Sequence, residues 1–105
     1  MPDRISDLLI ELKKRLQIYG SRLQGLYLYG SYARGDQEPG SDVDVIILLD
    51  RIDHYSLEID RTGELISDLS LKFGLSISRL FVSEHDWKHC DTPFLANARE
   101  EAIPA

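Results

Sequence analysis

A glycine turn and a pair of aspartates bracket one polar loop and constrain the fold more than any other feature of this chain. Gly30 and Ser31 follow a short aromatic and apolar run, while Asp42 and Asp44 open a second run that stays apolar to Leu49. Short apolar runs next to glycine-rich loops predict buried β-strands. Residues at i and i+2 of a strand point to the same side, about 6–7 Å apart. The sequence therefore predicts a sheet whose connecting loop carries a glycine turn and two neighbouring carboxylates.

Periodicity elsewhere in the chain predicts an α+β, or mixed α/β, fold with a small β-sheet. Apolar residues at i, i+3 and i+4 spacing predict helices, the last of them weak, over residues 5–19, 55–73 and 94–102. Strands are expected over residues 25–29, 43–49 and 75–82. One helical turn at 31–34 and a short turn at 84–89 complete the expected order.

We expect one domain over residues 1–105, with a core at about 5–83 and a C-terminal tail at 84–105. The acidic side chains of the second long helix are expected to form a solvated face. These side chains are Glu58, Asp60, Glu64 and Asp68.

Composition limits the kinds of partner and compartment that we expect. The formal net charge is −6, which disfavours broad electrostatic capture of nucleic acid as a direct partner. The single cysteine, Cys90, excludes an internal disulfide. The first residues show no signal-peptide pattern, and the apolar run 45–49 is too short to span a bilayer. A cytoplasmic protein without membrane contact is the expectation.

The residues of the central motif suit a phosphate ligand and a divalent cation. Two carboxylates such as Asp42 and Asp44 repel each other unless a cation lies between them. Mg²⁺ prefers a few carboxylates together with water and substrate phosphate oxygens. Gly30 allows backbone N–H groups to approach a ligand closely, and a helical turn that begins at Ser31 favours an anion. The hydroxyl groups of Ser31 and Ser41 can add donors, so the motif predicts a Mg²⁺–triphosphate site.

Two segments resemble the signature of the DNA polymerase β-like nucleotidyltransferase superfamily. They are residues 30–35, Gly-Ser-Tyr-Ala-Arg-Gly, and residues 41–44, Ser-Asp-Val-Asp. The resemblance is closest to the minimal nucleotidyltransferases, which are single-domain prokaryotic proteins of about this length. It implies a small mixed β-sheet flanked by helices. It also implies transfer of a nucleoside monophosphate from a nucleoside triphosphate, with pyrophosphate as the leaving group.

The same resemblance assigns roles to individual residues. It implies that Gly30 and Ser31 hold the β- and γ-phosphates, and that Asp42 and Asp44 are catalytic Mg²⁺ ligands. Arg34 matches the arginine of the family, and two roles stay open for it. It either contacts phosphate or bridges to a carboxylate such as that of Asp36.

The resemblance also points to a partner chain. Minimal nucleotidyltransferases often pair with a small helical HEPN-family protein, in a toxin–antitoxin system in which the nucleotidyltransferase is the antitoxin. The first hypothesis is therefore an antitoxin that uses Mg²⁺ and ATP to adenylylate its protein partner. The alternative is a non-catalytic antitoxin that binds the toxin and keeps a vestigial nucleotide site. Transfer to a small molecule is a weaker third option, and a homo-oligomer stays open.

One position departs from the superfamily pattern. Its members usually carry a third carboxylate on the next core strand, and here that position falls on Ser76, or on Ser78 in the neighbouring register. A neutral hydroxyl is a weak ligand for a hard cation, so the acceptor-side ion is expected to bind poorly. Transfer could then be slow, could use another acid such as Glu84, Asp86 or one from 58–68, or could be absent.

Overall fold

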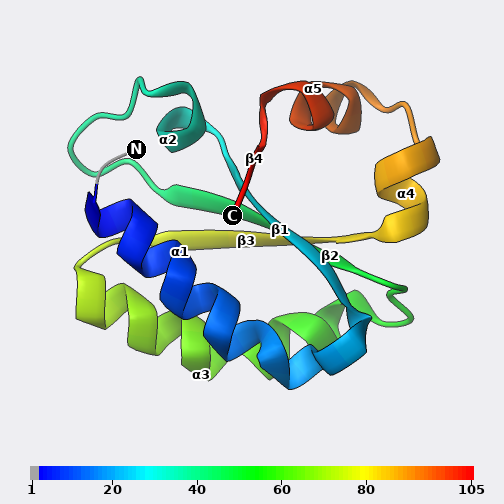
Figure 1. Cartoon of the computed structure of the whole chain (residues 1–105), viewed down its shortest axis with the longest axis horizontal. Coiled ribbons are helices and arrows are strands. Elements are labelled where there is room, and N and C mark those ends of the chain that lie inside the picture. Colours follow the sequence, from blue (N-terminus) through cyan, green and yellow to red (C-terminus); the bar gives the residue numbers. More distant parts are fainter. Residues whose placement is uncertain (1–2) are drawn as a thin grey trace.

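The computed structural model describes residues 3–105 (Figure 1). The helices are α1 (Asp3–Arg15), the 3₁₀ segment η1 (Leu16–Arg22), α2 (Ser31–Arg34), α3 (Tyr55–Phe73), α4 (Glu84–His89) and α5 (Pro93–Glu101). The strands are β1 (Leu23–Tyr29), β2 (Val43–Leu49), β3 (Ile77–Ser83) and β4 (Ile103–Pro104). This arrangement confirms the predicted α+β fold. Over residues 3–105, no helix combines the length and apolar character needed to cross a membrane.

The strands form one mixed sheet in the order β3-β2-β1-β4. β1 pairs antiparallel with both β2 and β4, whereas β2 and β3 run parallel. Parallel neighbours need a crossover connection, and α3 provides it. In Figure 1, α1 and α3 cover one face of the sheet, and α4 and α5 lie on the other. The small mixed sheet flanked by helices is therefore as expected.

The central strand β2 is buried on both faces, which explains its unbroken apolar sequence. Its odd-numbered residues join the main core against α1 and α3; they are Val43, Val45, Ile47 and Leu49. Its even-numbered residues Ile46 and Leu48 pack with Leu95 and Ala98 of α5. By the same alternation, Asp44 points to the α5 side of the sheet.

Several elements differ from the sequence prediction. The helix expected over 5–19 is divided into α1 and the 3₁₀ segment η1, and β1 begins at Leu23 and not at residue 25. Residues 84–89 form helix α4 and not a turn, because the hydroxyl of Ser83 caps the helix by accepting the N–H of Asp86 at 3.2 Å. β3 spans 77–83 and not 75–82. β4 had no sequence signal, since its two residues become a strand only by pairing with Tyr27 and Leu28 of β1.

Helix α3 buries a carboxylate that the sequence pattern assigned to solvent. The prediction of a solvated Glu58 is wrong: Glu58 is 4% exposed, whereas its apolar neighbour Leu57 is 49% exposed. The buried face of α3 runs through Glu58, Thr62, Leu65, Ile66 and Leu69. This spacing follows the helical repeat, so Glu58 lies on the core-facing side of α3. The sequence pattern missed this because a charged residue at such a position reads as exposed.

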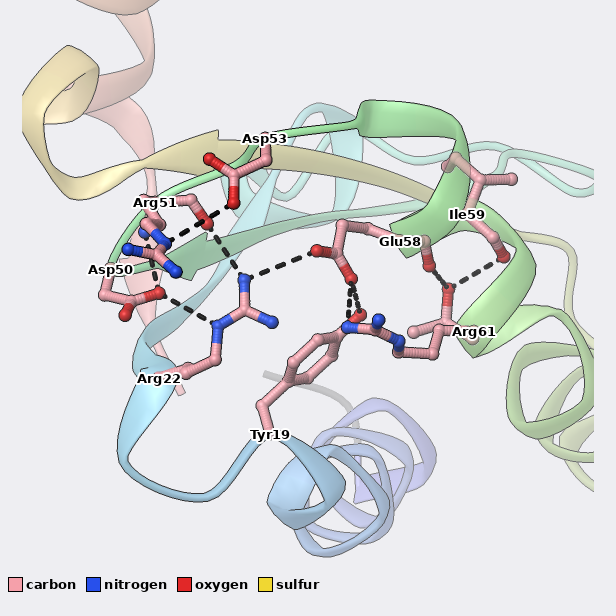
Figure 2. A network of polar contacts seen from close by, with 9 residues as sticks. Tyr19, Arg22, Asp50, Arg51, Asp53, Glu58, Ile59 and Arg61 are labelled. Carbon is pink, nitrogen blue, oxygen red and sulfur yellow. Dashed lines mark hydrogen bonds and ion pairs between the residues drawn. The ribbon is translucent and has the colours of Figure 1, made fainter.

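Three partners from two elements, η1 and α3, contact the buried carboxylate (Figure 2). The hydroxyl of Tyr19 donates to Glu58 Oε1 at 2.9 Å, and Arg61 Nη1 lies 3.2 Å from the same oxygen. Arg22 Nη2 lies 3.4 Å from Glu58 Oε2, and Arg22 Nε donates to Asp50 at 3.1 Å. Removing one partner of such a group would leave charge buried and uncompensated. The network therefore ties η1, α3 and the end of β2 together.

Tyr19 gives this network a measurable pH dependence. Burial, followed by the hydrogen bond to Glu58, raises the pKa of Tyr19 from 10.0 to about 12. The folded protein therefore favours the neutral phenol, and this contribution to stability is full below pH 10 and is lost as the pH rises toward 12. We expect the free energy of unfolding to fall more steeply over this interval in the wild type than in Tyr19→Phe. Denaturant titrations across the interval measure both slopes, and equal slopes would contradict the role of Tyr19.

Candidate active site

Gly30 joins β1 to α2 in a conformation that only glycine adopts readily. Its backbone has φ 76° and ψ −151°, and its carbonyl accepts the N–H groups of Ala33 and Arg34 at 3.0 and 3.1 Å. A Cβ atom at this position would collide with the carboxylate oxygen Oδ2 of Asp44 and lie 3.3 Å from its Cγ. The glycine turn and the second aspartate are therefore in direct contact.

Asp42 and Asp44 lie at the start of β2 with different environments. Asp42 is exposed in the last loop position, and Asp44 is partly buried as the second residue of the strand. Burial is the largest factor that raises the pKa of Asp44; the negative charge of Asp42 raises it further, and Arg34 opposes both. Asp42 and Arg34 therefore act on the Asp44 carboxylate with opposite effects. Such a pair of neighbouring acids fits a bound cation.

The register of β3 settles which residue stands beside Asp44. Ser78 pairs with Asp44 across the parallel β2–β3 ladder, whereas Ser76 precedes the strand and its carbonyl accepts the N–H of Val43 at 2.8 Å. Asp44 and Ser78 share a cavity of about 250 Å³ with Tyr29 and Phe94. The rings of Tyr29 and Phe94 meet edge to face, with centroids 5.4 Å apart. A hydroxyl therefore stands beside Asp44, where the resemblance led us to expect a third carboxylate.

No other acid within residues 3–105 completes the site. The described part of the chain holds no group of three or more His, Cys, Asp or Glu residues arranged to bind a metal. Glu84 pairs with Lys88 at 2.7 Å, and Glu58 belongs to the buried network of Figure 2. Asp86 lines a separate groove. The alternative in which one of these acids replaces the third carboxylate has no support in this arrangement.

Arg34 bridges two carboxylates at the edge of the site. Its Nε atom lies 3.2 Å from Asp36, which is the bridge that the sequence left open as one of two roles. Its Nη1 atom also lies 3.6 Å from Glu101 at the end of α5. Both pairs are solvent-exposed and therefore weak, so an incoming phosphate can compete for the guanidinium. The contact with Glu101 had no sequence signal, because it depends on how α5 packs on the sheet.

The two serines of the motif shape the loop. The carbonyl of Ser31 accepts the N–H groups of Gly35 and Asp36, which closes the α2 turn. The hydroxyl of Ser41 accepts the N–H of Glu38 at 2.9 Å and fixes the loop ahead of β2. The N–H groups at the start of a helical turn have no partner inside it, so those that open α2 are available to a ligand.

The chain belongs to the nucleotidyltransferase domain family, whose model matches residues 5–97. A Methanocaldococcus jannaschii protein named "Putative protein adenylyltransferase" is 34% identical over 84 residues, which cover 79% of this chain and 78% of the relative. A second protein of that name from the same organism is 37% identical over 75 residues, covering 70% and 75% of the two chains. The relationship therefore extends well beyond the motif.

Solved structures show that the fold is shared as well. A chain in the crystal structure of a toxin–antitoxin with AMP-PNP superposes with a TM-score of 0.64 and 21% identity. The match covers 98% of this chain and 72% of that one. The expected nucleotidyltransferase fold is thus confirmed.

Replacing Gly30 by alanine separates the close contact from ordinary backbone strain. Gly30→Ala is expected to lose Mg²⁺–ATP affinity, because the new Cβ displaces the Asp44 carboxylate, and to be destabilised by about 1–3 kcal/mol. Gly35→Ala is the matched control, because Gly35 has a similar φ of 78° and no atom within 4 Å of an added Cβ. We expect the control to lose about 1 kcal/mol of stability and to keep its nucleotide affinity. Equal losses of affinity in the two variants would show that the contact with Asp44 is irrelevant.

Proposed function

We propose that this chain transfers AMP from ATP to a hydroxyl group of a protein partner. One observation carries the proposal: the Asp44 carboxylate lies against the Gly30 turn and is coupled electrostatically to Asp42. This juxtaposition brings acidic metal ligands next to backbone donors for phosphate, which is the pairing that a metal-bound triphosphate requires. Asp42 and Asp44 are the proposed catalytic and metal-binding residues. Gly30, Ser31, Arg34 and Ser41 are the proposed nucleotide-binding residues.

Two relatives named as protein adenylyltransferases support the choice of AMP and of a protein acceptor. The toxin–antitoxin neighbour with AMP-PNP supports an ATP-like ligand and a role beside a toxin. We therefore propose that the chain is a cytoplasmic antitoxin and that its acceptor is a small helical toxin of the HEPN family.

The proposed reaction is an in-line displacement at phosphorus. The acceptor oxygen forms a bond to the α-phosphorus, the bond from that phosphorus to the bridging oxygen breaks, and pyrophosphate leaves. A Mg²⁺ ion held by Asp42 and Asp44 would neutralise charge on the phosphates and on the leaving pyrophosphate. The turn at Gly30 orients the β- and γ-phosphates through its N–H groups, and Arg34 exchanges its exposed carboxylate partners for phosphate oxygens.

The acceptor proton has no carboxylate to receive it on the β3 side of the site. Ser78, opposite Asp44, is a poor base at neutral pH, so the proton passes to water. General-base assistance typically contributes about 10²–10⁴-fold to a rate, so transfer in this chain is expected to be slow. The same serine favours the second candidate function, an antitoxin that binds its toxin and a nucleotide without transfer.

A labelling experiment distinguishes the two candidates. Incubation of the chain with its proposed partner, a small helical HEPN-family protein, together with Mg²⁺ and ATP labelled at the α-phosphate is expected to label that partner. Asp42→Asn and Asp44→Asn are expected to abolish the label, because they remove the proposed metal ligands. Asp60→Asn, an exposed residue of α3, is the matched control and keeps it. A tight complex that never becomes labelled would reject transfer and support the binding function.

Ser78→Asp tests whether the missing carboxylate limits the rate. The substitution places a third acid beside Asp44, so we expect transfer to accelerate by about 10²-fold, at the lower end of general-base effects. Ser76→Asp serves as the control, because Ser76 lies outside β3 and is expected to leave the rate unchanged. The single-turnover rate with labelled ATP measures both variants. If Ser78→Asp is no faster than wild type, the hydroxyl at this position does not limit transfer.

A further inference from the structure

A second groove opens beside the candidate active site and shares a wall with it. The groove has a volume of about 390 Å³ and lies along β3, between the loop after β2 and helix α5. Leu80 and Phe94 line both this groove and the cavity of Asp44 and Ser78. A ligand in the groove would therefore lie next to the cavity that Asp44 lines, with Leu80 and Phe94 between them.

The walls of the groove are aromatic and incompletely buried. Tyr55 and Phe94 both line the groove, and each of them is 41% exposed. The hydroxyl of Tyr55 accepts the N–H of Phe81 at 3.2 Å, which holds the ring and occupies that donor of the outer strand. The groove therefore suits an apolar side chain. Because the N–H of Phe81 already donates to Tyr55, a strand of another chain is hindered from pairing with β3 at this residue.

Within residues 3–105, the negative Asp86 is the only charged residue that lines the groove, and Asp44 is the only one that lines the adjoining cavity. Arg34 acts electrostatically on Asp44 but lines neither of them. Asp86 is exposed, and its carboxylate accepts only a weak hydrogen bond from Cys90, at 3.3 Å. The whole chain carries −6 as well. A basic segment is attracted to this surface and an acidic one is repelled, and a nucleotide phosphate finds no cationic partner along the groove.

We propose that the groove is the docking site for the acceptor segment of the protein substrate. An apolar side chain of that segment occupies the hollow between Tyr55 and Phe94, and a lysine or arginine pairs with Asp86. The neighbouring residue then extends past Leu80 and presents its hydroxyl to Asp44. This assignment rests on the proposed function for its chemistry, but binding in the groove needs neither ATP nor transfer.

Titration with short peptides tests the docking site without the reaction. The probes are the peptide Lys-Leu-Tyr-Leu-Lys and its counterpart with glutamates in place of both lysines, each added to ¹⁵N-labelled protein in the absence of ATP. We expect amide shifts at Tyr55, Val82, Asp86 and Phe94 with the basic peptide, and affinity about tenfold weaker with the acidic one. Asp86→Lys is expected to reverse this preference. Asp7→Lys makes the same charge change on exposed α1, at the opposite face of the sheet, and is expected to leave the preference intact.

The outcomes separate this inference from the proposed function. Equal affinity for the two peptides, shifts confined to other surfaces, or equal effects of the two lysine substitutions would overturn the docking site. Transfer of AMP to the natural partner at an unchanged acceptor KM in Asp86→Lys would also overturn it while leaving the proposed function in place. Groove shifts with the expected preference, in a chain that transfers nothing, would support the docking site and reject transfer.

Discussion

The contact between Gly30 and the carboxylate of Asp44 is the constraint on which the candidate site depends. It requires that β1 and β2 lie side by side with Tyr29 opposite Asp44, so that the turn after β1 ends against the second residue of β2. Glycine is needed twice there, once for its backbone conformation and once for the missing Cβ. A residue with a side chain would separate the acids from the N–H groups that open α2, and the two halves of the motif would no longer act on one ligand.

The opposite side of the molecule supports this arrangement through a buried charge network. Glu58 holds the first turn of α3 to Tyr19 and Arg22, and α3 in turn carries the chain from β2 to β3. Because that crossover fixes the parallel register, it also fixes Ser78 beside Asp44. A buried ion pair is weak evidence for added stability. Because Glu58 has three partners, however, the network fixes how η1 packs against α3. The buried network therefore supports the candidate site indirectly, through α3 and the register of β3.

Local pattern carried much of the fold prediction. The bounds of β2, α3 and α2 followed from apolar runs, helical spacing and glycine positions. The alternation along β2 also placed Val43, Val45 and Ile47 together in the main core. The prediction from local sequence failed where contacts with residues distant in the chain decide whether a side chain is buried or a strand forms. Glu58 is buried because Tyr19 and Arg22 meet it, and β4 exists because the edge of β1 is there to receive it. The choice between Ser76 and Ser78, and the wall that Phe94 gives the site, likewise depend on packing.

Calorimetric titration of ATP, with and without Mg²⁺, is the most direct test of the central claim. The wild type is expected to bind ATP only when Mg²⁺ is present. Asp44→Asn is expected to lose that dependence together with most of the affinity, because the carboxylate against the glycine turn is the group that couples metal to phosphate. Binding that ignores Mg²⁺, or that survives unchanged in Asp44→Asn, would contradict the account.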